Sequence, residues 1–118
     1  MSHGTTAMED TKKPNHVHVT IDSLGAVCCD PNPLPADGKD VKLKFVLLTD
    51  GYVFPQDKAV VVADPGVEFP EPAKTSSDTI ATLFDRNTGP GSFTYTVTVQ
   101  KVSTGELLRH DPLINNGP

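Results

Sequence analysis

Four bonds in this chain join an acidic residue to proline, and these bonds are the groups most able to react. Three are aspartyl-prolyl and one is glutamyl-prolyl: Asp30-Pro31, Asp64-Pro65, Asp111-Pro112 and Glu71-Pro72. An aspartate carboxyl group reaches its own carbonyl carbon through a five-membered ring, and a prolyl nitrogen leaves readily once it is protonated. Asp-Pro bonds are therefore the weakest in a chain toward acid. A fold could exploit this weakness by placing a second carboxylate to activate water or move the proton.

Turn formation is the simpler explanation of an Asp-Pro pair, because aspartate caps a turn and proline fixes φ. We favour that explanation for Asp30-Pro31 and Asp64-Pro65. Asp111-Pro112 differs in position, since it ends the last strand that the sequence predicts and lies seven residues from the C-terminus. Cleavage there would leave a short peptide, residues 112–118, that strand pairing still holds.

Cleavage of this last bond needs a carboxylate to activate water, and the candidates are Asp50 and Asp85, which spacing alone does not rank. An amine that traps the new carboxyl end would come from a lysine. Lys101 is the nearest lysine in the final predicted hairpin, and Lys42 and Lys44 are the next candidates. Partial burial of Lys101 would lower its pKa and supply a neutral amine. The simpler alternative is a strand-end lysine that extends into solvent.

The register of the final hairpin decides which side chain faces the bond. Counting back through an even loop pairs Val102 with Leu107 and sets Thr98 opposite Asp111. No lysine then lies directly across the ladder, so the pairing does not bring Lys101 to the new carboxyl end.

Other chemistry has weaker support in the sequence. His16-Val17-His18 projects two imidazoles from one face of a strand, which is half of a transition-metal site, and His110 or a carboxylate would have to complete it because His3 lies in the polar N-terminal segment. We favour solvent-facing histidines. The chain has no nucleophile elbow and no phosphate-binding glycine pattern, so we expect no cofactor and no ordinary enzyme class.

Composition predicts one small acidic domain. The chain has 118 residues, 11 prolines, 9 glycines and a formal charge of −5, with its basic residues scattered. That charge predicts neither a nucleic-acid nor an anionic-membrane partner. Residues 1–15 lack the apolar core of a signal peptide and no stretch is long enough to span a bilayer, so we expect a cytoplasmic protein. Cys28 and Cys29 are adjacent, and we expect one buried and one exposed thiol more than a strained vicinal disulfide.

Alternating apolar and polar residues predict a series of short strands. These are residues 16–21, 25–29, 41–49, 58–63, 79–84, 93–101 and 107–111. Asp50-Gly51, followed at once by Tyr52, predicts a two-residue hairpin. Prolines end the second strand at residues 30–35 and make residues 67–74 an extended connection.

Six to eight short strands without an amphipathic helix predict an all-β domain, an antiparallel two-sheet sandwich that is immunoglobulin-like or related. The Cys…Trp…Cys signature of true immunoglobulin domains is absent, because the chain has no tryptophan. We expect residues 1–14 to form a disordered tail and residues 15–118 to form the single domain.

Four segments, VKLKFVLLTDGYVF, ADPGVEFPEP, TYTVTVQ and HDPLINNGP, together resemble the bacterial DP-EP family of small β-sandwich proteins over residues 16–118. That family is associated with self-cleavage by an aspartic-peptidase-like mechanism at a C-terminal Asp-Pro bond, whose new aspartyl end becomes linked to a lysine amine. The resemblance implies that Asp111 supplies the scissile carbonyl, Pro112 the leaving nitrogen and residues 112–118 the released or retained peptide.

Three hypotheses follow from the sequence. The first is a self-processing β-sandwich, a single-turnover intramolecular endopeptidase of the aspartic type, whose partner is its own C-terminal peptide, residues 112–118. The second is a non-enzymatic binding or assembly module that presents loops or an exposed strand edge. The third and weakest is a metal-binding protein that uses His16 and His18.

Overall fold

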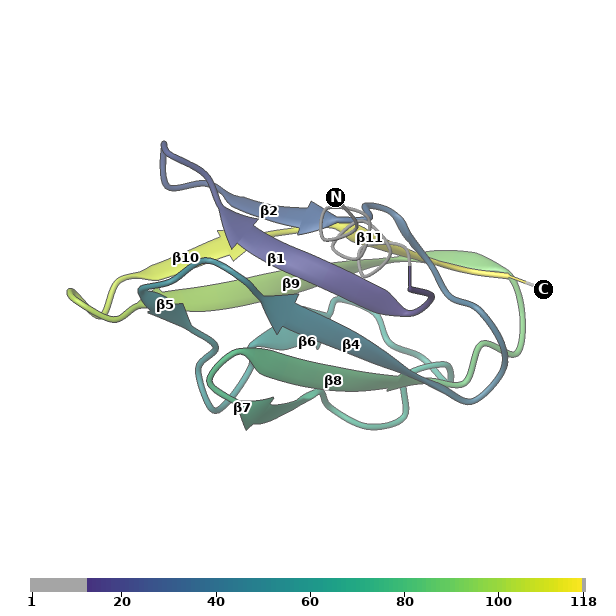
Figure 1. Ribbon diagram of the computed structural model, residues 1–118. Helices are drawn as coiled ribbons and strands as arrows, with labels where there is room; N and C mark the ends of the chain where they lie inside the picture. The colour runs from purple at the N-terminus through teal and green to yellow at the C-terminus, as the bar shows by residue number, and fades with distance from the viewer. Residues whose placement is uncertain (1–12, 118) are drawn as a thin grey trace.

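The computed structural model describes residues 13–117, and within that range the chain forms strands and no helix. The strands are β1 His16–Ile21, β2 Val27–Asp30, β3 Leu34–Pro35, β4 Val41–Leu47, β5 Tyr52–Val53, β6 Val60–Val62, β7 Lys74–Ser77, β8 Ile80–Asp85, β9 Gly91–Lys101, β10 Leu107–His110 and β11 Leu113–Asn116. Figure 1 labels each of them except β3. The predicted tail lies outside the described residues, except for Lys13 and Pro14. In the described part there is also no helix of the length and apolarity that crossing a membrane requires.

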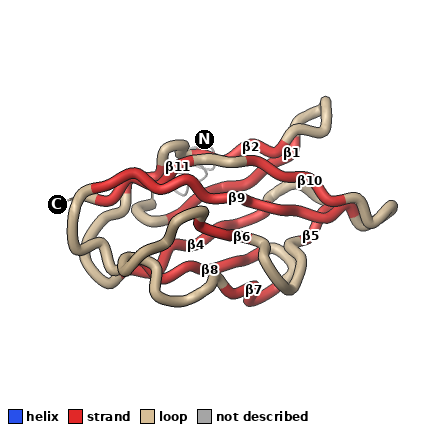
Figure 2. Tube along the Cα trace, turned by 180° about the vertical axis from the view of Figure 1, so that it is seen from behind, coloured by secondary structure: helices blue, strands red, loops and turns tan. Residues whose placement is uncertain are grey.

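The strands form two sheets. The first sheet has the order β2-β1-β4-β8-β7. In the second sheet β9 is central, with β10 and β11 along one edge, β3 beyond β11, and β5 and β6 along the opposite edge. Figure 2 shows β9 from behind, between β10 and β6. β9, at 11 residues the longest strand, is therefore the central strand of the second sheet.

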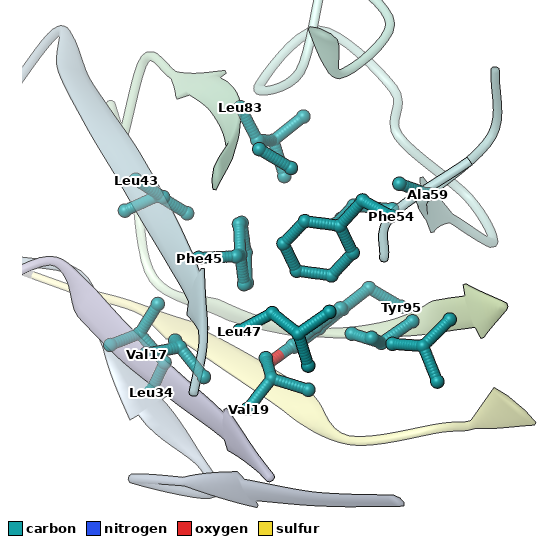
Figure 3. Close-up of a cluster of buried hydrophobic side chains, with 14 of the residues drawn as sticks. Val17, Val19, Leu34, Leu43, Phe45, Leu47, Phe54, Ala59, Leu83 and Tyr95 are labelled. Atoms are coloured by element: carbon teal, nitrogen blue, oxygen red, sulfur yellow. The ribbon is translucent and has the colours of Figure 1, made fainter. Parts of the chain in front are cut away.

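Apolar side chains of both sheets meet in one core, because the alternation along each strand turns them to the same side. Val17 and Val19 of β1 have no exposed surface, and neither do Phe45 of β4 and Tyr95 of β9. The rings of Phe45 and Tyr95 meet in the core with their centroids 5.4 Å apart. Figure 3 shows both residues among the buried side chains that surround them. Full burial of each large apolar side chain stabilises the fold by roughly 1.5–3 kcal/mol.

The all-β prediction is confirmed, but the purely antiparallel pairing and the count of six to eight strands are wrong. β1 pairs with β4 in parallel, and β11 pairs with β3 in parallel. The chain leaves β2, adds β3 to the second sheet and returns to place β4 beside β1 in the same direction. The prolines at residues 31–35 therefore do not exclude a strand, since a two-residue edge strand tolerates the missing donor.

The predicted hairpin at Asp50-Gly51 is also wrong. A turn forms there, with Gly51 at a φ of 88°, but Tyr52 pairs with Lys101 of β9 and not with β4. Both edges of β4 are already occupied by β1 and β8, so the chain that follows the turn crosses to the other sheet. The turn therefore connects the two sheets.

Candidate functional site

The Asp111-Pro112 bond lies within strand pairing and not in a turn. β10 and β11 pair with β9 in one continuous register, which sets Asp111 opposite Thr96. The backbone N–H of Tyr95 donates to the Pro112 carbonyl at 3.0 Å. Turn formation therefore does not explain this Asp-Pro pair.

The register of the hairpin differs from the predicted one by two residues. Leu107 lies opposite Gln100 and not opposite Val102. The final turn is displaced by one residue toward the N-terminus, because the Lys101 N–H donates to the Glu106 carbonyl at 2.8 Å and leaves residues 102–105 between them, where residues 103–106 were expected. Every residue of β10 thereby moves to a different partner on β9.

A threonine holds the carboxylate beside the bond. Thr96 Oγ1 donates to Asp111 Oδ1 at 2.7 Å on the outer face of the second sheet. Asp111 is exposed, whereas Pro112 is fully buried. Pro112 has no N–H to return a bond to the Tyr95 carbonyl, so the ladder is interrupted at the residue that follows Asp111.

The Asp111 carbonyl points away from β9. Residues of an antiparallel strand alternate between bonding the partner strand and facing away from it, and Pro112 is the one that bonds β9 here. Its neighbours therefore face the other side, where the Leu113 N–H donates to Asn32 Oδ1 at 3.0 Å. The Asp111 carbonyl is thus directed toward the segment that follows Asp30, the last residue of β2. β2 runs beside β10 in Figure 1.

Two of the predicted site residues, Lys101 and Asp50, lie at the far end of β9. Lys101 pairs with Tyr52, and the turn containing Asp50 directly precedes Tyr52. Thr96 and Lys101 are separated by five positions along an extended strand, or roughly 17 Å. The described structure therefore does not bring the Lys101 amine or the Asp50 carboxylate to Asp111. Lys42 and Lys44 lie on β4, in the other sheet.

Asp85, on β8 of the first sheet, lies beside the end of β11 that is remote from Asp111, in a buried polar cluster. It occupies the last inward-facing position of β8 and has no exposed surface. Asp85 Oδ1 accepts hydrogen bonds from the Asn87 N–H at 2.9 Å and from Asn116 Nδ2 at 3.0 Å. Asn116 is opposite Gly91 on β9, five positions from Thr96, so Asp85 contacts the C-terminal peptide and not the Asp-Pro bond.

The pKa of Asp85 is raised above its ordinary value, and burial is the main cause. The hydrogen bonds from Asn116 and Asn87 act in the opposite direction, and the negative charge of Glu68 adds to the increase. A carboxyl group in such surroundings favours its protonated form.

The histidine pair lies on the outer face of the first sheet. His16 and His18 alternate with buried valines, and His18 lies opposite Asp30 of β2. His110 is on β10 in the other sheet, and His3 lies outside the described residues. Among residues 13–117 no three histidine, cysteine or acidic side chains converge to hold a metal ion.

An apolar groove of 320 Å³ lies beside β6. It is bounded by β6, by Leu83 and by the connection around Phe69–Ala73, and Glu71 is the charged residue on its wall. Val61 at the middle of β6 is 43% exposed. The connection predicted as extended therefore forms one wall of the groove.

Sequence reasoning missed Thr96 as the partner of Asp111, and Asn32 and Asn116 as residues that attach the C-terminal peptide to the rest of the fold. Asn116 follows Ile114 at the two-residue spacing of an inward face, which was the available signal. The roles of Thr96 and Asn32 depend on the register of β9 and on the path of the chain into β3, which no local sequence pattern indicates. No protein-family model and no curated protein matches the chain. The resemblance to the DP-EP family stays a prediction from the segments quoted above.

Proposed function

We propose that this protein processes itself by one intramolecular cleavage of the Asp111-Pro112 bond. The observation that carries the proposal is a proline placed inside a paired strand, next to an exposed aspartate whose carboxylate Thr96 holds at 2.7 Å. Almost any other residue at position 112 would complete the ladder with Tyr95, so proline here costs stability. A costly residue retained at one position suggests a chemical use.

The reaction that fits these groups is hydrolysis through the side chain of Asp111. The carboxyl oxygen attacks the Asp111 carbonyl carbon and closes a five-membered anhydride, while the bond to the Pro112 nitrogen breaks and that nitrogen takes up a proton. Water then opens the anhydride, so that one water is consumed and Asp111 ends with two carboxyl groups. Orientation of the carboxyl group by Thr96 reduces the entropy lost in ring closure.

Asp30 is the carboxylate that we propose for water activation, because it ends β2 two residues before Asn32, which bonds the Leu113 N–H at 3.0 Å. The lysine crosslink known in the DP-EP family is a separate step, since it needs an amine at the anhydride. The separation of Lys101 from Thr96, roughly 17 Å along β9, favours water as the acceptor. Hydrolysis is therefore the expected outcome.

Intact-mass measurement of the purified chain tests the proposal. We expect a slow conversion at mildly acidic pH into two products, one ending at Asp111 and one beginning at Pro112. Asp111→Ala should abolish the conversion, Thr96→Val should slow it roughly tenfold by releasing the carboxylate, and Asp30→Asn should slow it as well. Asp64→Ala is the matched control, because it removes an aspartyl-prolyl bond that lies in a turn. A chain that stays intact for weeks under these conditions would refute self-processing.

Strand addition at β6 is a second candidate function, and one observation favours it. Ala59 and Ala63 bond β9 through Thr98 and Thr94, so the alternation directs the N–H and C=O groups of Val60 and Val62 away from β9. No hydrogen bond within residues 13–117 engages these outward groups. An extended peptide could pair with them and place apolar side chains in the groove.

Hydrogen exchange distinguishes this binding function from self-processing. An extended peptide that alternates valine with lysine should protect the amides of Val60 and Val62, whereas the same peptide with N-methylated backbone should not. Protection elsewhere on the protein, or equal effects of both peptides, would exclude strand addition at β6.

A further inference from the structure

Two buried oxygen atoms of one residue pair lack a hydrogen-bond partner. Asp85 Oδ2 and Asn116 Oδ1 are each buried without a partner in the described structure, although the two side chains are joined by the bond from Asn116 Nδ2 to Asp85 Oδ1 at 3.0 Å. Asp85 has no exposed surface and Asn116 is 5% exposed. The pair is therefore buried, and in each side chain one polar atom is hydrogen-bonded while the other has no partner.

An ionised aspartate would leave this pair unsatisfied. A carboxylate and an amide oxygen only accept hydrogen bonds, so neither can satisfy the other. A proton on Asp85 Oδ2, donated to Asn116 Oδ1, satisfies both oxygens and closes a ring of two hydrogen bonds between the carboxyl and amide groups. The same proton removes the cost of burying a charge.

We propose that Asp85 is a positioning residue, held as a neutral acid, that fastens Asn116 and so keeps the C-terminal strand β11 in place. This role rests on the self-processing function proposed above, and it determines whether the cleaved peptide stays bound. Because Asn116 belongs to the peptide that begins at Pro112, the Asp85–Asn116 pair keeps that peptide bound after cleavage. The product is then a nicked protein of two chains.

The surroundings of Asp85 favour the neutral form. Its neighbours are Val41, directly across the ladder on β4, and Asn116 of β11, which bonds it, and both are uncharged. Within the described residues the charged group that acts on Asp85 is Glu68, from the connection before β7, and its charge is negative. Burial and this charge both favour retention of the proton.

A second asparagine fastens the same end of the chain. Asn87 Oδ1 accepts the Gly117 N–H at 3.0 Å, and Asn87 Nδ2 donates to the carbonyls of Gly38 at 2.8 Å and Gly117 at 3.3 Å. The Asn87 N–H also bonds Asp85. Asp85 therefore acts at a junction where β8, the loop after it and the C-terminal peptide meet.

The pH dependence of stability tests this role. The folded-state pKa of Asp85 is raised, so its contribution is fully present below the unfolded value and is lost as pH rises through the folded value. Urea unfolding of the full chain should show stability falling over that range. Asp85→Asn should remove this slope and keep the stability of the acidic form, because an amide can both donate to Asn116 Oδ1 and accept from its Nδ2.

Asp85→Ala should raise the unfolding equilibrium constant roughly tenfold or more at pH values below the folded-state pKa of Asp85, and this difference should shrink above it. Infrared spectra provide a second readout: the wild type should keep a protonated-carboxyl band at pH values where the exposed carboxyls have ionised, and Asp85→Asn should lack it. Absence of that band together with a stability loss in Asp85→Asn would overturn the proposal, since ionised Asp85 would then be the stabilising form.

Retention of the peptide separates this role from the cleavage itself. If the chain cleaves, native mass spectrometry should find residues 112–118 still bound in the wild type and in Asp85→Asn, and lost from Asp85→Ala. If the chain never cleaves while the infrared band and the pH slope are present, self-processing fails and the fastening of β11 by Asp85 stands. Cleavage with early loss of the peptide from the wild type would refute the fastening alone.

Discussion

At the scale of single residues, burial decides which of the two adjacent cysteines can react. Cys28 is exposed, whereas Cys29 packs against the core beside Tyr95. Burial raises the pKa of Cys29 to about 12. The Tyr95 hydroxyl lies beside the Cys29 thiol in the same buried surroundings, and burial raises its pKa as well. Because the thiolate is the nucleophile, only Cys28 should be reactive in the folded protein.

Alkylation with iodoacetamide at pH 8 checks this expectation. We expect one adduct in the folded chain and a second one only after unfolding, and Cys28→Ser should give no adduct while folded. Two adducts under native conditions would mean that the strand β2 opens readily or that Cys29 is not buried.

The Glu68 carboxylate gives a second prediction at the residue scale. It accepts bonds from the backbone N–H and hydroxyl of Thr88 and from the Gly89 N–H, and the Thr88 backbone bond is the main cause that lowers its pKa. A lowered folded-state pKa gives stability that is present above the usual value of about 4.3 and lost as pH falls through the folded value. Glu68→Gln should therefore flatten the acid side of the stability profile measured by urea unfolding. An unchanged acid limb would contradict the role of this carboxylate.

At the scale of elements, β11 is an integral part of the fold although its sequence gives a weak strand signal. Ile114 has no exposed surface, and the strand pairs with β9 on one side and β3 on the other. Ile114→Ala should cost about 2–5 kcal/mol, whereas Leu113→Ala, at a position 37% exposed, should cost much less. Equal losses measured by urea unfolding would mean that β11 does not pack on the core as described.

Local patterns predicted the strands that alternate over six or more residues, and they failed where pairing partners decide the structure. β1, β4, β8 and β9 were predicted within a few residues of their bounds. β2, β6 and β10 were also predicted, and β5 was expected with β4 as its partner instead of β9. β3, β7 and β11 were missed as strands, because their sequences contain proline or are largely polar and they gain their stability from neighbouring strands. Asp111 could be named from the sequence, but its contact with Thr96 depends on where the final turn begins, which alternation does not reveal.

At the scale of the whole molecule, the protection of the sheet edges is uneven. Edge strands invite pairing with other chains unless charges, prolines or bulges blunt them. β7 carries Lys74 and an irregular register, β3 is two residues long and ends in Pro35, and β2 ends in Asp30. β6 reads Val60–Val62 without a charge, and it borders an apolar groove. The charge of −5 provides a general repulsion between copies of the molecule.

The exposed edge of β6 makes a prediction that hydrogen exchange can decide. Val61 bonds β9, whereas Val60 and Val62 direct their amides outward, so the Val61 amide should exchange on the order of 100-fold more slowly than either neighbour. Val61→Lys should leave the stability nearly unchanged, because the side chain is 43% exposed, and it should suppress any self-association seen at high protein concentration. Slow exchange at Val60 and Val62 in the isolated monomer would mean that the edge is already covered. Slow exchange that appears only at high concentration, and disappears in Val61→Lys, would identify a second copy of the chain as the strand that covers β6.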